Sequence, residues 1–179
     1  MSTDLMIDLE TLDTTVTAKI LSVGLCFFDI ATGDVRPRAS GTVPLAGQEN
    51  RTMNDETLNW WMTQTDKAWS LTRGGEQTDL RKLLHVISDH VKMFPGIRVW
   101  GNGATFDISI IEHAFNEYGI PVPWDYRNVR DMRTFVEVGQ LTTGVDIRSK
   151  VPFEGVKHCA VDDAVWQAKV VSEIWKVLG

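Results

Sequence analysis

The sequence has only two cysteines, Cys26 and Cys159, among its 179 residues. It has no apolar run long enough to cross a membrane, and its N-terminal segment has no basic stretch followed by an apolar one. We therefore expect no secretory signal and no membrane span. Two isolated cysteines in such a chain indicate free thiols in a reducing cytoplasm rather than a disulfide framework.

Positive charge is also scarce, because 18 lysines and arginines face 24 acidic residues, for a net charge of −6 at pH 7. This balance argues against a protein that coats nucleic acid through a broad basic surface. It does not exclude an enzyme that binds a nucleic-acid end locally, with metal ions neutralising part of the charge. The hydrophobic fraction of 43% is typical of a globular protein. The length predicts a single domain over residues 1–179, with no domain before the first strand.

The most informative stretch is residues 5–10, where apolar side chains alternate with Met6, Asp8 and Glu10. This alternation is typical of a strand, and it places both carboxylates on one face, roughly 7 Å apart at their bases. Two like charges on a buried strand need a compensating partner. A divalent cation such as Mg²⁺ or Mn²⁺ is the simplest one. The alternative is a solvated edge strand, because so short a pattern is common by chance.

The next residues predict an antiparallel start to the sheet. Residues 19–30 read as a long strand, and the turn signal at residues 32–34 predicts a hairpin. Residues 35–45 contain two prolines, which suits an edge strand. Together with the first strand, these segments make three antiparallel strands.

Residues 55–69 look helical and carry Trp60, Trp61 and Trp69. Aromatic side chains usually serve a core, so one interpretation is that they pack this segment onto the sheet. The other is that one of them offers a stacking face to a nucleobase.

The second half of the chain alternates helices with short strands. We expect a helix capped by Thr78, a strand at residues 97–100 that pairs in parallel, and another short strand and turn at residues 128–134. Further expected segments are a helix that opens near Asp107, a helix from Phe135, a loop over residues 139–156 and a last helix over residues 158–178.

Two later positions carry chemistry but are ambiguous alone. Asp107 follows a glycine-containing turn after a strand, where ligands bind in open sheets, but an acidic residue at a helix N-terminus is often only a capping residue. His158 precedes the last helix, and a lone histidine at a helix end is often structural.

Taken together, these residues resemble the DEDDh 3′–5′ exonucleases, a branch of the ribonuclease H-like fold. The first motif of that family, Asp-x-Glu, matches Asp8-Leu9-Glu10, and its second matches Asp107 within Asn-Gly-Ala-Thr-Phe-Asp. Its third, His-x-Ala-x-x-Asp, matches His158 and selects Asp163 rather than Asp162. The resemblance spans nearly the whole chain. It implies an α/β fold with a mixed central sheet, three antiparallel strands followed by parallel strands, and helices on both faces.

The resemblance also implies a mechanism with two Mg²⁺ or Mn²⁺ ions. Asp8, Glu10 and Asp163 would hold one ion, and Asp8 would bridge to a second one supported by Asp107. His158 would take the proton from the attacking water. The products would be nucleoside 5′-monophosphates.

Substrate contacts are expected near the same motifs. The resemblance implies that the backbone at Leu9 and Thr11 approaches the terminal nucleotide. Asn102 and Phe106 flank the second motif and are candidates for lining the pocket. Trp61 is the candidate for a stacking contact.

The expected partner is the 3′ end of single-stranded nucleic acid. No motif reports on the 2′-hydroxyl, so DNA and RNA both stay open, with a slight preference for DNA and an exoribonuclease as the alternative. Similar short exonucleases occur in bacteria and phages, which suggests a bacterial or phage-infected cytoplasm, and many form homodimers. The rival hypotheses are a non-catalytic nucleic-acid-binding module and another ribonuclease H-like enzyme, such as an endonuclease.

Overall fold

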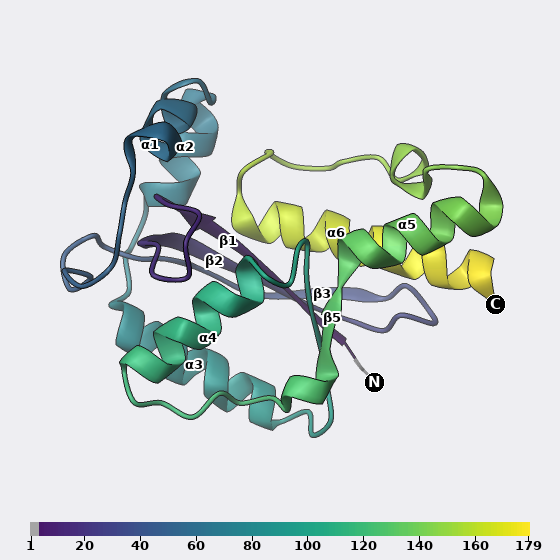
Figure 1. The fold of residues 1–179 in the computed structure, drawn as a ribbon, viewed down its shortest axis with the longest axis horizontal. Coiled ribbons are helices and arrows are strands. Elements are labelled where there is room, and N and C mark those ends of the chain that lie inside the picture. Colours follow the sequence, from purple (N-terminus) through teal and green to yellow (C-terminus); the bar gives the residue numbers. More distant parts are fainter. Residues whose placement is uncertain (1–3) are drawn as a thin grey trace.

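A central mixed sheet organises the molecule (Figure 1). The structure is a computed structural model that describes residues 4–179, apart from the side chains of residues 37 and 38. Within this range the sheet has five strands in the order β3-β2-β1-β4-β5. The strands are β1 (Asp4–Thr11), β2 (Ile20–Phe28), β3 (Val35–Thr42), β4 (Arg98–Gly101) and β5 (Val129–Asp131). The first three are antiparallel, whereas β4 lies parallel to both β1 and β5, as the sequence predicted.

Helices cover both faces of the sheet (Figure 1). The six α-helices of the described range are α1 (Asp55–Met62), α2 (Asp66–Arg73), α3 (Leu80–Lys92), α4 (Asp107–Glu117), α5 (Met132–Thr143) and α6 (Ala160–Leu178). Helices α3 and α4 pack on one face of the sheet and α5 and α6 on the other, which confirms the expected α/β arrangement. None of the helices within residues 4–179 has the length and apolarity that a bilayer crossing requires.

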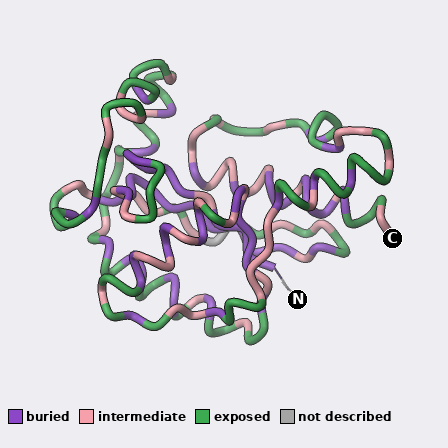
Figure 2. The backbone as a smooth tube through the Cα atoms, viewed as in Figure 1, coloured by how far each residue is buried: buried purple, intermediate pink, exposed green. Residues whose placement is uncertain are grey.

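The alternation in β1 separates the two hydrophobic cores. Leu5, Ile7 and Leu9 point into the core under α3 and α4, whereas Met6 points into the core under α5 and α6. Figure 2 shows the result, with the central strands buried and the outer loops exposed. Since the period of a strand is two residues, the carboxylates that follow Met6 are placed on the α6 side of the sheet.

The tryptophan-rich segment is two helices rather than one. The first helix ends at Met62, and Thr65 begins a second helix, α2, because its side chain accepts a hydrogen bond from the backbone N–H of Ala68. Similarly, α3 is capped by Asp79 and not by Thr78, since Asp79 accepts a hydrogen bond from the backbone N–H of Lys82. The second difference arises because Thr78 and Asp79 are adjacent polar side chains, either of which can cap the same helix start.

Helix α5 also begins earlier than predicted. Asp131 accepts a hydrogen bond from the backbone N–H of Thr134 at 2.8 Å, so the helix begins at Met132 rather than at Phe135. It continues into the expected loop and ends at Gly144, whose φ of 73° is the left-handed conformation that glycine adopts readily.

Close packing of α6 on the sheet depends on Gly24. This residue pairs with Asp8 across β1 and β2. A Cβ atom at Gly24 would collide with the backbone of Ala160, the first residue of α6. The missing side chain therefore lets the N-terminus of α6 lie directly beside the carboxylates of β1.

Candidate active site

The carboxylates of β1 differ in how they are compensated. Asp4 is buried, but its two carboxylate oxygens accept hydrogen bonds from the guanidinium of Arg98 at 2.7 and 2.6 Å. The indole N–H of Trp100 donates to the same carboxylate at 2.7 Å. Asp8 and Glu10 lie on the same face of the strand, and no salt bridge within residues 4–179 compensates either of them. The outer end of β1 therefore carries a site for a positive group.

The start of α6 completes this end of the site. The ligand atoms of Glu10, His158 and Asp163 all lie within 4.8 Å of one another. Asp163 Oδ2 accepts a hydrogen bond from the backbone N–H of His158 at 2.7 Å. One turn further along α6, the side-chain amide of Gln167 donates to Asp8 Oδ1 at 2.7 Å. The first and third motifs therefore meet through α6.

Asp107 reaches the same site from the other side of β1. It is the first residue of α4, is buried, and accepts a hydrogen bond at Oδ1 from the backbone N–H of Leu9 at 3.1 Å. The parallel pairing of β1 with β4 ends at Met6 and Trp100, so it leaves the Leu9 N–H free for this contact. Asp107 of the second motif can reach β1 because β4 no longer pairs with β1 at this point.

Burial raises the pKa of all four carboxylates, and neighbouring carboxylates raise those of Asp8 and Glu10 further. Burial, together with Asp107, Glu10 and Asp163, raises the pKa of Asp8 well above its usual range. Burial raises the pKa of Glu10 to about 8, with further contributions from Asp163 and Asp107. Burial also raises the pKa of Asp107 to about 7 and that of Asp163 to about 6. The site therefore concentrates negative charge that a cation would stabilise.

His158 faces this cluster as a neutral base. Burial and the nearby Lys157 lower its pKa below the usual value for histidine. Its ring and that of Trp60 form a T-shaped pair, with ring centroids 4.8 Å apart. An uncharged imidazole next to carboxylates has the properties of a proton acceptor at neutral pH.

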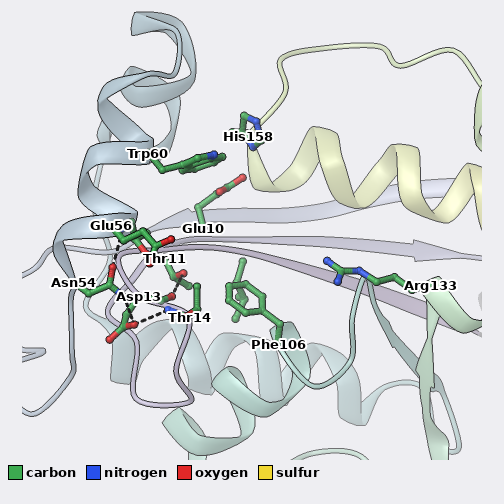
Figure 3. A pocket seen from close by; sticks show the side chains of 12 residues that line it. Glu10, Thr11, Asp13, Thr14, Asn54, Glu56, Trp60, Phe106, Arg133 and His158 are labelled. Atoms are coloured by element: carbon green, nitrogen blue, oxygen red, sulfur yellow. Dashed lines mark hydrogen bonds between the residues drawn. The ribbon is translucent and has the colours of Figure 1, made fainter.

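A cavity of about 550 Å³ opens onto Glu10 and His158 (Figure 3). Its wall includes the expected residues Leu9, Thr11 and Phe106, but not Asn102. The full lining is Leu9, Glu10, Thr11, Asp13, Thr14, Asn54, Glu56, Thr57, Trp60, Phe106, Arg133 and His158. In the close view, Trp60 and Phe106 lie on opposite sides of Glu10, and Arg133 extends toward the cavity from the start of α5.

The prediction that Trp61 stacks on a base is wrong, because this residue is only 3% exposed. Its indole N–H donates to the backbone oxygen of Thr11 at 2.9 Å, and it packs in a small core beside β1. The neighbouring Trp60 is 41% exposed and lines the cavity instead. Trp61 therefore packs its helix onto the sheet, and Trp60 becomes the candidate for stacking on a base.

Three residues of the site were not identified from the sequence. Gln167 had a detectable signal, since it lies four residues after Asp163 and therefore on the same face of α6. The adjacent pair of tryptophans gave no signal for choosing Trp60. Arg133 could not be found, because its place depends on where α5 begins.

The sequence of the chain matches one known family. The model of the Rv2179c-like 3′–5′ exoribonuclease domain matches residues 3–175. No curated protein matches the chain by sequence.

Solved structures share the fold at low sequence identity. The nuclease domain of 3′hExo, described as a DEDDh family member bound to rAMP, is 14% identical with a TM-score of 0.58, over 96% of this chain and 90% of that one. Cell-death related nuclease 4 (CRN-4) is 12% identical with a TM-score of 0.68, over 96% of this chain and 63% of that one. S. pombe Pop2p in its Mg²⁺- and Mn²⁺-bound form is 14% identical with a TM-score of 0.65, over 97% and 82%. These likenesses confirm the ribonuclease H-like exonuclease fold, and none of these proteins is described as a phage protein.

Proposed function

The chain belongs to the Rv2179c-like 3′–5′ exoribonuclease domain family, and from this membership we propose that it shortens single-stranded RNA from the 3′ end, releasing nucleoside 5′-monophosphates. Its class as a 3′–5′ exonuclease follows from the family itself. The observation that carries the finer proposal is the convergence of Glu10, His158 and Asp163 within 4.8 Å beside the cavity.

The donor set fits divalent cations. Buried carboxylate oxygens without a cationic partner are the ligands that Mg²⁺ and Mn²⁺ prefer. Asp8, Glu10 and Asp163 would hold one ion, and Asp8 together with Asp107 would hold a second. Two such ions would supply positive charge to the attacking and leaving oxygens of a phosphodiester.

The protein's own groups then supply the proton transfer. His158 accepts the proton of the attacking water, a role that its lowered pKa supports because the ring stays neutral at pH 7. Gln167 holds the Asp8 carboxylate in place through its amide N–H. The backbone N–H of Leu9 does the same for Asp107.

The wall of the cavity supports a single-stranded substrate. Trp60 and Phe106 flank the approach to Glu10 from opposite sides (Figure 3). Aromatic side chains in this position stack on a base only when the base has left a duplex. We expect the terminal base to lie against them.

RNA is proposed over DNA because the matched family is described by exoribonuclease activity. The slight preference for DNA expected from the sequence had no residue to support it. A DNA exonuclease is the second candidate, because stacking on Trp60 and Phe106 would serve a deoxyribonucleotide as well as a ribonucleotide.

Digestion of matched 5′-labelled RNA and DNA oligonucleotides, each single- and double-stranded, tests the proposal with Mg²⁺ or Mn²⁺ present. We expect stepwise shortening of single-stranded RNA, and its loss in Asp163→Asn and in His158→Ala. Faster digestion of DNA would overturn the substrate assignment. Internal fragments would indicate an endonuclease, and binding without hydrolysis would indicate a non-catalytic module. Full activity in either variant would show that the residue roles are wrong.

A further inference from the structure

His158 has an unusual backbone conformation. Its φ of 64° makes it the one non-glycine residue with positive φ in the described range. A side chain with a Cβ atom disfavours this left-handed region, so the surrounding structure must hold the residue there. The contacts that do so determine where the imidazole points.

Two hydrogen bonds and the rings of Trp60 and Trp61 hold His158 in place. Its backbone N–H donates to Asp163 Oδ2 at 2.7 Å, and its backbone oxygen accepts from Thr72 Oγ1 at 2.8 Å. Its ring meets the ring of Trp60 at 4.8 Å. Thr72 is 1% exposed and belongs to α2, 86 residues earlier in the chain, so its hydrogen bond is a tertiary contact.

The helices that supply three of these contacts are themselves fixed to β1. The indole N–H of Trp61 in α1 donates to the backbone oxygen of Thr11, the residue after Glu10. The rings of Trp61 and Trp69 are 5.3 Å apart, and Trp61 packs with Leu12 in a small core. The tryptophan-rich helices therefore connect the strand that carries Glu10 with the loop that carries His158.

We propose that Thr72 is a positioning residue for His158, and that α1 and α2 serve to hold this imidazole against Glu10 and Asp163. The proposal rests on the proposed role of His158 as the proton acceptor. It assigns a role in the reaction to a buried threonine that contacts neither substrate nor metal. It also gives the tryptophan-rich segment a task beyond packing.

Thr72→Val removes the hydroxyl at nearly constant shape. We expect kcat on single-stranded RNA to fall about tenfold, because a displaced base is less well aligned with the attacking water. KM should stay within about twofold, since Thr72 does not line the cavity. Thr72→Ser should restore kcat. The control is Thr143→Val, which removes hydroxyl hydrogen bonds to the backbone of Gly139 and Val145 at the end of α5, away from the site, and should leave kcat unchanged.

Two further readouts separate positioning from a general loss of structure. In a His158→Ala background, Thr72→Val should leave the residual rate unchanged, because no imidazole remains to be placed; an equal loss in both backgrounds would indicate a structural role and overturn the proposal. In the metal-free protein, amide hydrogen exchange over residues 156–160 should rise in Thr72→Val but not in Thr72→Ser.

Wild-type kcat in Thr72→Val with an inactive His158→Ala would refute the positioning role and leave the proposed function intact. High activity in His158→Ala would refute the proposed function instead.

Discussion

At the scale of single residues, the central contrast lies within β1. Asp4 and Asp8 share one strand and one face, but only Asp4 has an arginine beside it. The guanidinium of Arg98 makes Asp4 a structural carboxylate. Asp8 and Glu10 have raised pKa values and no such partner, which is the pattern expected of groups that bind a cation during function.

Arg133 is the residue that we expect to contact the incoming chain. It is the one lysine or arginine that lines the cavity in the described structure, and it makes no hydrogen bond or ion pair there. Its guanidinium lies against Gly103. The guanidinium carbon is 3.3 Å from the position that a Cβ atom would take at this glycine. We predict that Arg133→Ala raises KM for an RNA decamer at least about tenfold, the loss expected for one charge-assisted hydrogen bond, with little change in kcat.

Two comparisons make this prediction specific. The p-nitrophenyl ester of a nucleoside 5′-monophosphate has only the scissile phosphate, so its KM should not change in Arg133→Ala. Arg130→Ala removes the same charge three residues away, from a side chain that binds backbone oxygens outside the cavity, and should behave as wild type. An equal rise in KM for both substrates would place Arg133 at the scissile phosphate instead.

The sequence predicted the catalytic candidates better than the substrate contacts. Asp8, Glu10 and Asp163 stand in motifs whose spacing is set by one strand and one helix, so the pattern is visible along the chain. Trp60 and Trp61 are adjacent in α1, and which of them faces the cavity depends on how α1 sits on the sheet. That orientation is a tertiary property that no local pattern contains.

At the scale of elements, the packing of α6 on β2 sets the site. The antiparallel and parallel character of the strands followed from alternation and turn signals, whereas two helices begin at an aspartate cap that the sequence did not single out. Asp131 is one of these caps, and it also accepts a hydrogen bond from the backbone N–H of Ala104 at 2.6 Å. It thereby ties the turn before Asp107 to the start of α5, a link that the sequence pattern could not reveal.

Gly24→Ala tests the contact between α6 and the sheet. The new methyl group would overlap the backbone of Ala160, and backbone cannot move aside as a side chain can. We predict that the free energy of unfolding falls by about 2–3 kcal/mol and that activity is lost, because α6 and its Asp163 would be displaced. Urea denaturation and RNA digestion measure the two effects.

Gly41→Ala is the matched control. It adds a methyl group at another strand position, where the nearest atoms belong to the flexible side chain of Leu83. We expect a loss below about 1 kcal/mol and normal activity. Equal effects of the two substitutions would mean that the contact at Gly24 has no special importance.

At the scale of the whole molecule, the acidic site links stability to pH. The pKa of Glu10 is about 8 in the folded protein and 4.5 as a free side chain, so the unfolded chain releases this proton at lower pH than the folded one. The raised pKa values of Asp107 and Asp163 act in the same direction. The stabilising contribution is therefore complete below pH 4.5 and is lost as pH rises to about 8.

We predict that the metal-free protein becomes less stable between pH 5 and pH 8 by several kcal/mol, and that Mg²⁺ restores much of the loss at pH 8. Urea denaturation across this range, with a chelator or with Mg²⁺, measures both effects. Glu10→Gln removes one of these titrating groups and should make the metal-free profile less steep, with Asp107 and Asp163 accounting for the rest. A metal-free stability that rises toward pH 8 would contradict the burial of these carboxylates.

The most direct test of the account is anomalous diffraction from crystals of the protein soaked in Mn²⁺. We predict two anomalous peaks between the carboxylates, one within bonding distance of Glu10 and Asp163 and one beside Asp107, with Asp8 next to both. Asp163→Asn should weaken the first peak. Clear density for these side chains with no anomalous peak among them would contradict the claim that the four carboxylates form a metal site.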